Sequence, residues 1–157
     1  MRDKKLAERL AESGIRPSYQ RLRIYEWIVL SSDHPTADEI YTELVKEIPT
    51  LSKTTVYNSL NLFVKNGLIR VLHVRGNETR YDANLEEHGH FYCECCGRVY
   101  DFPLDVDGLK CHEALNTFEI NTRHVYFKGL CPKCRNIKMG DSKKEETDEK
   151  FKGNQDG

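Results

Sequence analysis

Two Cys-x-x-Cys pairs constrain this 157-residue chain more than any other feature of its sequence, and they are Cys93/Cys96 and Cys131/Cys134. Each pair can offer two thiolates to one ion, and four thiolates around a tetrahedral ion form a closed, structural zinc site. Redox-active pairs and buried free thiols are the alternatives for these cysteines. All six cysteines lie between Cys93 and Cys134, so the residues before them must fold without thiol chemistry. The sequence therefore predicts two differently built parts, the second of them tied together by Zn²⁺.

The polarity of the chain bears on its compartment. The first residues, MRDKKLAERLAESG, carry charges throughout and lack the apolar segment of a secretory signal. No apolar run reaches the roughly 18 residues that a membrane-spanning helix needs. We therefore expect a cytoplasmic protein with no membrane partner, where reducing conditions favour zinc over disulfides. The formal net charge of −1 permits nucleic-acid binding without indicating it.

Helical signals dominate the first half of the chain. Thr36 and Glu39 fit a capping box, and apolar residues then recur at helical spacing as far as Ile48. Ser52 is a natural N-cap for the next helix, which Gly67 ends. The predicted elements are helices at 4–13, from Pro17-Ser18 onward, at 36–48 and between Ser52 and Gly67, then strands at 68–74 and 79–83 joined by a turn at 75–78.

The helix between Ser52 and Gly67 has one apolar and one polar face. Its polar stripe contains Thr54, Asn58, Asn61 and Lys65, and its apolar stripe contains Val56, Leu60, Phe63 and Val64. Three helices and a hairpin, with a polar last helix, are typical of a winged helix-turn-helix that places this helix in the major groove. A solvated surface helix would explain the polar stripe but not the order of helices and wing. The predicted DNA contacts are Lys53, Thr54, Thr55, Tyr57, Asn58 and Lys65, with Arg75 on the wing.

A different kind of candidate metal ligand lies just before the first cysteine pair. His88 and His90 are one residue apart on an extended segment, so their side chains point the same way and can chelate one ion. Asp82 precedes them and Asp101 follows. Imidazoles mixed with carboxylates suit Fe²⁺, Mn²⁺ or Zn²⁺, whereas four thiolates favour Zn²⁺. The remaining cysteines, Cys95 and Cys111, have no Cys-x-x-Cys partner and are interpreted as structural or incidental.

Over roughly residues 4–136, the chain resembles the ferric uptake regulator (Fur) family of bacterial metal-dependent repressors. The matching motifs are His34-Pro35-Thr36-Ala37-Asp38, Thr55-Val56-Tyr57, Arg80-Tyr81-Asp82, H-x-H-F-x-C-x-x-C-G from His88 to Gly97, and Cys131-x-x-Cys134. The resemblance implies an α+β chain with a winged helix-turn-helix DNA-binding domain at 1–83. A metal-binding α/β dimerisation domain with the structural zinc would follow at 84–138. The charged tail at 139–157 predicts disorder.

The resemblance also implies a regulatory site for Fe²⁺ or Mn²⁺ with five ligands, which are His34, Asp82, His88, His90 and Asp101. An ion there would hold the two halves of a subunit in one relative pose. In a homodimer, that pose would set the spacing of two recognition helices against a palindromic operator on double-stranded DNA. Metal affinity and DNA affinity would then be linked reciprocally.

The residue at position 101 points to a branch of the family. Iron-sensing relatives usually have Glu where this chain has Asp101, which is typical of the peroxide-sensing branch. In that branch, bound iron(II) reduces peroxide and the oxidant formed in place attacks a ligating histidine, and the matching targets are His34 and His88. Asn61 stands where peroxide regulators often have Arg. His124 lies one position from the family's usual histidine, so we do not assign it as a ligand.

Other functions remain open from the sequence. A ferric-uptake or zinc-responsive repressor would use the same fold, with metal supply as the signal. A non-haem iron oxygenase could use two histidines and a carboxylate, but it would leave the winged helix unexplained. A zinc-ribbon interaction module would leave His34, Asp82 and Asp101 without a role. We therefore expect a regulator rather than an enzyme.

Overall fold

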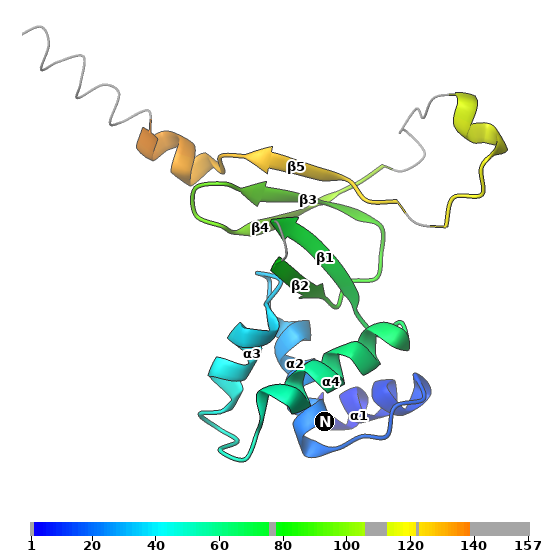
Figure 1. Ribbon diagram of the computed structural model, residues 1–157, viewed down its shortest axis with the longest axis vertical. Helices are drawn as coiled ribbons and strands as arrows, with labels where there is room; N and C mark the ends of the chain where they lie inside the picture. The colour runs from blue at the N-terminus through cyan, green and yellow to red at the C-terminus, as the bar shows by residue number, and fades with distance from the viewer. Residues whose placement is uncertain (1, 76–77, 106–112, 122, 139–157) are drawn as a thin grey trace, which may run out of the picture. The chain divides into compact units, whose positions relative to one another are not determined.

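The computed structural model describes residues 2–75, 78–105, 113–121 and 123–138, and it divides between Glu87 and His88 into two compact units. The N-terminal unit contains α1 (Arg2–Glu12), α2 (Tyr19–Leu30), α3 (Ala37–Leu44), α4 (Lys53–Lys65), β1 (Arg70–Arg75) and β2 (Glu78–Asp82) (Figure 1). The C-terminal unit contains β3 (His88–Cys93), β4 (Val99–Pro103), the 3-10 helix η1 (Glu113–Thr117) and β5 (Tyr126–Gly129), and residues 132–138 are helical. The predicted α+β class is confirmed.

The limits of the predicted domains are a separate question from the fold class. A boundary at residues 83/84 stays a prediction, and the tail at 139–157 and Cys111 lie outside the described residues. No described helix has both the length and the apolar character needed to cross a membrane.

Side chains at the helix starts satisfy backbone N–H groups, as the sequence predicts. The Ser18 and Ser52 hydroxyls accept from the third residue of α2 and α4, and Thr36 and Glu39 form a reciprocal capping box. The third helix is shorter than predicted, because α3 ends at Leu44 and not at Ile48. A turn with an Ile48 N–H bond to the Leu44 carbonyl, 2.8 Å long, still delivers Ile48 to the core. The apolar spacing is therefore kept without the last helical turn.

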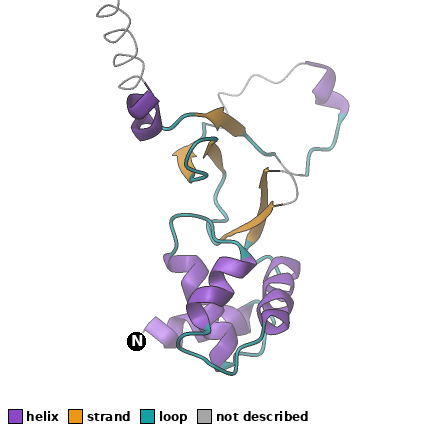
Figure 2. Ribbon diagram, turned by 60° about the vertical axis from the view of Figure 1, so that its left-hand side comes forward, coloured by secondary structure: helices purple, strands orange, loops and turns teal. Residues whose placement is uncertain are grey.

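The core of the N-terminal unit lies among its helices, which gather together beside the hairpin in Figure 2. The apolar stripe of α4 supplies its centre, because Val56, Leu60 and Phe63 are fully buried. The Phe63 ring meets Tyr25 of α2 edge to face, with centroids 5.8 Å apart. This packing turns the opposite, polar face of α4 outward.

Each unit has its own small sheet. In the N-terminal unit, β1 and β2 form an antiparallel hairpin, and an isolated bridge joins Arg80 of β2 to Thr36. In the C-terminal unit, β3 is central, with β4 antiparallel on one side and β5 parallel on the other. A central strand holds both of its neighbours in register, so the residues of β3 have fixed cross-strand partners.

Replacing the central core ring tests this account of the N-terminal unit. We expect Phe63→Ala to lower the free energy of unfolding by about 3–5 kcal/mol, since the lost contacts leave a cavity. Urea denaturation followed by helical circular dichroism measures the change. Leu30→Ala is the matched control, because Leu30 is 54% exposed and its truncation should cost less than about 0.5 kcal/mol. Equal losses for both variants would contradict the assignment of the core.

Candidate metal and DNA-binding sites

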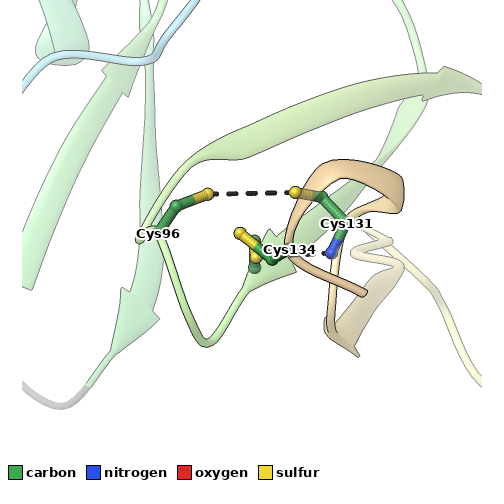
Figure 3. A group of neighbouring side chains, drawn as sticks. Cys96, Cys131 and Cys134 are labelled. Carbon is green, nitrogen blue, oxygen red and sulfur yellow. Dashed lines mark hydrogen bonds between the residues drawn. The ribbon is translucent and has the colours of Figure 1, made fainter. Parts of the chain in front are cut away.

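Four cysteine sulfurs converge in the C-terminal unit. Cys93 ends β3, Cys96 lies in the turn after it, and Cys131 and Cys134 follow β5. The four Sγ atoms all lie within 4.8 Å of one another, and those of Cys96 and Cys131 are 4.0 Å apart (Figure 3). Tetrahedral zinc with bonds of about 2.3 Å separates its sulfurs by about 3.8 Å. The cluster therefore fits the predicted structural Zn²⁺ with little movement.

The turn between Cys93 and Cys96 has the backbone that such a site needs. Gly97 adopts a left-handed conformation, with φ of 71°, that a residue with a side chain rarely adopts. Its N–H donates to the Cys93 carbonyl over 2.9 Å, and the Cys93 N–H donates to the Arg98 carbonyl over the same distance. The chain thereby reverses directly after β3 and brings Cys96 back beside Cys93.

The electrostatics of the cluster favour a cation. The Cys131 N–H donates to Cys93 Sγ over 3.3 Å, and this bond is the main reason that the pKa of Cys93 falls to about 6. The pKa of Cys131 is lowered first by the Cys134 N–H, whereas hydrogen bonding to Cys131 raises the pKa of Cys134. Thiolates this close together repel one another, so a dication among them would stabilise the fully ionised set.

Cys95 differs from its neighbours. It is exposed and does not belong to the group of four, although it lies between Cys93 and Cys96 in the sequence. Its interpretation as incidental stays a prediction.

A second group of predicted metal ligands lies on the C-terminal sheet, and we call His88, His90 and Asp101 the C-terminal ligand set. His90 of β3 faces Asp101 of β4 directly in the register. The Nε2 atoms of His88 and His90 lie 3.6 Å and 3.5 Å from the same Asp101 oxygen. Both imidazoles are nearly buried, and their rings are 4.5 Å apart. The alternation of β3 places the two imidazoles on one face, as the sequence predicts, and the pairing with β4 brings the Asp101 carboxylate beside them.

Gly89 makes this arrangement possible from the opposite face. It is paired with Phe102 of β4, and a Cβ atom built on Gly89 would overlap the Phe102 ring. The ring of Phe102 also packs on Phe127 of β5, with centroids 5.5 Å apart. A side chain at position 89 would therefore displace the strand or the ring, and with it the spacing of the two histidines.

The other two predicted ligands lie in the N-terminal unit, and we call His34 and Asp82 the N-terminal ligand set. His34 Nε2 lies 3.9 Å from Asp82 Oδ1, and both residues are buried. The Asn84 N–H donates to the same Asp82 oxygen over 2.7 Å, which orients the carboxylate. Among the described residues, His34 is the one residue other than glycine with positive φ, at 50°. Strained backbone of this kind persists only where the surrounding structure enforces it, and it is concentrated at functional sites.

The remaining described histidines have other surroundings. His124 is exposed and its ring stacks on Tyr126, with centroids 5.9 Å apart. His73 is exposed on β1, where it pairs with Thr79.

The polar face of α4 is exposed as a winged helix requires. Thr54, Tyr57, Asn58 and Lys65 are solvent-accessible, and Thr55 is half-buried. Lys53 is exposed too, and Asp38 bonds to its ammonium over 2.8 Å and raises its pKa. Arg75 ends β1, but its side chain lies outside the described part of the chain.

The structure adds polar residues that the sequence analysis did not select. A hollow of about 320 Å³ lies between the start of α2 and α4, lined by Ser18, Gln20, Arg21, Thr55, Asn58 and Ser59. A helix start combined with an Arg is favourable for a phosphate group. The sequence signal was available in the Ser18 N-cap with Arg21 three residues later, but only the packing places it beside α4.

Comparisons with known proteins agree with this arrangement. The model for the ferric uptake regulator family matches residues 12–107. The peroxide operon regulator of Bacillus subtilis is 36% identical over 135 residues, covering 83% of this chain and 92% of that protein. The Campylobacter jejuni peroxide stress regulator is similar in structure, with a TM-score of 0.62, 30% identity, and coverage of 83% of this chain and 97% of that one. The Vibrio cholerae ferric uptake regulator has a TM-score of 0.67 at 25% identity, with coverage of 80% and 98%.

Two cysteine variants test the composition of the zinc site. We expect Cys134→Ser to lose zinc and to destabilise the C-terminal unit, because three thiolates and a hydroxyl bind the ion less well. Cys95→Ser is the matched control and should keep one zinc ion per chain. Elemental analysis of the purified protein measures the content. Equal zinc loss in both variants would contradict the exclusion of Cys95.

Proposed function

The chain belongs to the ferric uptake regulator family, and from that premise we propose that it is a metal-dependent transcriptional repressor that senses peroxide. It would act in the cytoplasm as a homodimer bound to a palindromic operator on double-stranded DNA. It would regulate and not catalyse, in keeping with a family of regulators. Its named relatives include the peroxide operon regulator of B. subtilis and the peroxide stress regulator of C. jejuni.

The observation that carries the proposal is the presence of two chemically different ligand groups. The four cysteine sulfurs form a closed set suited to Zn²⁺, which has no redox chemistry. The C-terminal ligand set instead offers two imidazoles and a carboxylate, which suit Fe²⁺ or Mn²⁺. A protein with one permanent metal and one exchangeable metal can keep its fold while its second site responds to the cell.

The proposed regulatory site combines both ligand sets. His34 and Asp82 would bind the same ion as His88, His90 and Asp101, so that the ion fixes the N-terminal unit relative to the C-terminal one. In a homodimer, this would set the separation of the two α4 helices to match operator half-sites. Binding of metal and binding of DNA would strengthen each other by the same factor.

Peroxide would release the DNA by changing a ligand. When bound, Fe²⁺ would lend an electron that activates hydrogen peroxide beside the imidazoles, and it would recover that electron as the ring is oxidised. The proposed targets are His34 and His88. In a ring that reacts, one C–H bond would be replaced by a C–O bond, and the oxygen would come from one molecule of hydrogen peroxide. The rest of that peroxide would leave as water. Because the peroxide provides that oxygen and leaves as water, no further co-reactant is consumed overall. An oxygenated ring is a poorer ligand, so the two units would lose their common ion.

The proposed DNA interface is the outward face of α4 with the start of α2. Asn58 lies midway along α4, where an amide can read a base edge in the major groove. Lys65 at the end of α4 and Arg21 of α2 would contact phosphates. Lys53 would exchange its bond to Asp38 for a phosphate. Arg75 would extend the contact to the wing.

An iron- or zinc-responsive repressor is the second candidate. The fold is similar to that of the V. cholerae ferric uptake regulator, and the same ligands would then report metal supply. The two candidates differ in what happens to the histidines when peroxide is added.

Peroxide treatment of the metal-loaded protein separates these candidates. We expect the Fe²⁺ form to lose operator binding and to gain one oxygen atom on the peptides that contain His34 or His88. The Mn²⁺ form is the matched control and should keep both its DNA binding and its peptide masses, because Mn²⁺ activates peroxide poorly. Fluorescence anisotropy and peptide mass spectrometry measure the two outcomes. Unmodified histidines with intact DNA binding in the Fe²⁺ form would eliminate the peroxide proposal and leave the metal-supply candidate.

Variants of α4 test the DNA interface. With an operator selected from random-sequence DNA, we expect Asn58→Ala to weaken specific binding by about 1–3 kcal/mol, since a base contact is lost. Lys65→Ala should weaken binding to all sequences and lower the salt slope by about 1, since a phosphate contact is lost. Lys46→Gln, on the exposed side of the turn after α3, is the charge-matched control. Wild-type affinity and salt dependence in both α4 variants would refute this face as the interface.

A further inference from the structure

Arg80 of β2 grips the backbone of the segment that carries His34. Its Nη1 atom donates to two successive carbonyls, that of Asp33 over 3.2 Å and that of His34 over 3.1 Å. The side chain of Arg80 is only 12% exposed, so these bonds form largely out of water. A guanidinium has several donors in a fixed plane, which suits it to holding two acceptors at once.

These hydrogen bonds from Arg80 flank His34, the one residue of this segment with a strained backbone. The φ of His34 is 50°, a left-handed conformation that a residue with a Cβ atom rarely adopts. Left to itself, the backbone would relax to negative φ and carry the imidazole elsewhere. The hydrogen bonds to the Asp33 and His34 carbonyls fix the peptide groups on either side of the His34 Cα atom. Arg80 therefore opposes that relaxation directly.

Strand β2 contacts His34 in two ways from the same face. Arg80 and Asp82 are two residues apart on the strand, so their side chains point to the same side. Arg80 bonds to the backbone of His34, while Asp82 Oδ1 lies 3.9 Å from its imidazole Nε2. The Tyr81 N–H, between them, donates to the Pro35 carbonyl over 3.0 Å. The strand thus positions the backbone and the ring of His34 together.

Two carboxylates also hold the guanidinium. Arg80 Nε donates to Glu78 Oε1 over 2.6 Å, and Nη1 lies 3.8 Å from Glu39 Oε2. That Glu39 oxygen accepts the Thr36 N–H in the capping box of α3, over 2.7 Å. Arg80 is therefore held by two carboxylates while it holds two carbonyls, and it cannot leave one partner without disturbing the others.

We propose that Arg80 is a positioning residue for the regulatory metal, which holds His34 in its left-handed conformation so that the imidazole and Asp82 meet one ion. The inference rests on the proposed function, because it assigns a role at the same site. Arg80 does not bind the ion itself. Its loss lowers the affinity for the regulatory metal and spares both the structural zinc and the DNA-reading surface.

Mn²⁺ titration of the zinc-loaded, 157-residue protein tests the proposal. Free Mn²⁺ is counted by electron paramagnetic resonance for wild type, Arg80→Gln, Arg80→Lys and the control Lys46→Gln. We expect Arg80→Gln to weaken Mn²⁺ binding about 10–100-fold, the usual effect of losing a group that orients a ligand. Arg80→Lys keeps the charge but donates to fewer partners, so its affinity should fall between the two. Lys46→Gln should bind Mn²⁺ as wild type does.

Further measurements separate positioning from general loss of structure. Zinc content and helical circular dichroism of Arg80→Gln should equal those of wild type, and operator affinity should recover at saturating Mn²⁺. Wild-type Mn²⁺ affinity in Arg80→Gln would overturn the proposal. So would a loss of Mn²⁺ that only follows a loss of helix in both Arg80 variants, or operator binding that stays weak when Mn²⁺ saturates the site. A wild-type protein that binds no Mn²⁺ beyond its zinc would instead refute the proposed function.

Discussion

The strict alternation of side chains along β3 is the constraint on which the C-terminal unit depends. Successive residues of a strand face opposite sides, so His88 and His90 share one face and Gly89 takes the other. The strand then ends at Cys93, whose sulfur accepts a hydrogen bond from the Cys131 N–H. A single strand thereby fixes two imidazoles and one edge of the thiol cluster, and a shift of one residue in its register would lose both.

The N-terminal unit must hold its predicted ligands differently, because one comes from a loop and the other from a hairpin. A loop is usually the least fixed part of a domain. Here the residues around His34 are bonded to β2 through the Tyr81 N–H and through the guanidinium of Arg80. The loop thus pairs with the hairpin as an extra strand would. This pairing gives it the rigidity that a predicted imidazole ligand needs.

Much of the architecture could be predicted because its causes are local in the sequence. The capping box at Thr36 and the serine N-caps depend on residues three apart, and the two-faced pattern of α4 depends on helical spacing. The proximity of the two Cys-x-x-Cys pairs could be predicted because two such pairs are the usual sequence pattern of a four-thiolate zinc site. The early end of α3 could not be predicted, since a hydrogen-bonded turn buries Ile48 as well as another helical turn would. The role of Arg80 was also hidden, because its carbonyl partners lie more than forty positions earlier in the chain.

The pairing of Gly89 with Phe102 limits how the predicted ligands His88, His90 and Asp101 could be transferred to another protein. The histidine pair looks portable, as a three-residue motif that any exposed strand could accept. Its middle position, however, accepts only glycine, because an aromatic ring from the adjacent strand occupies the space that a Cβ atom would need. Copying His-Gly-His alone would leave a bare backbone position in a weakened strand, since glycine packs nothing and lowers strand stability. The smallest portable unit is therefore the antiparallel pair of β3 and β4, with the ring and the carboxylate of β4 carried along.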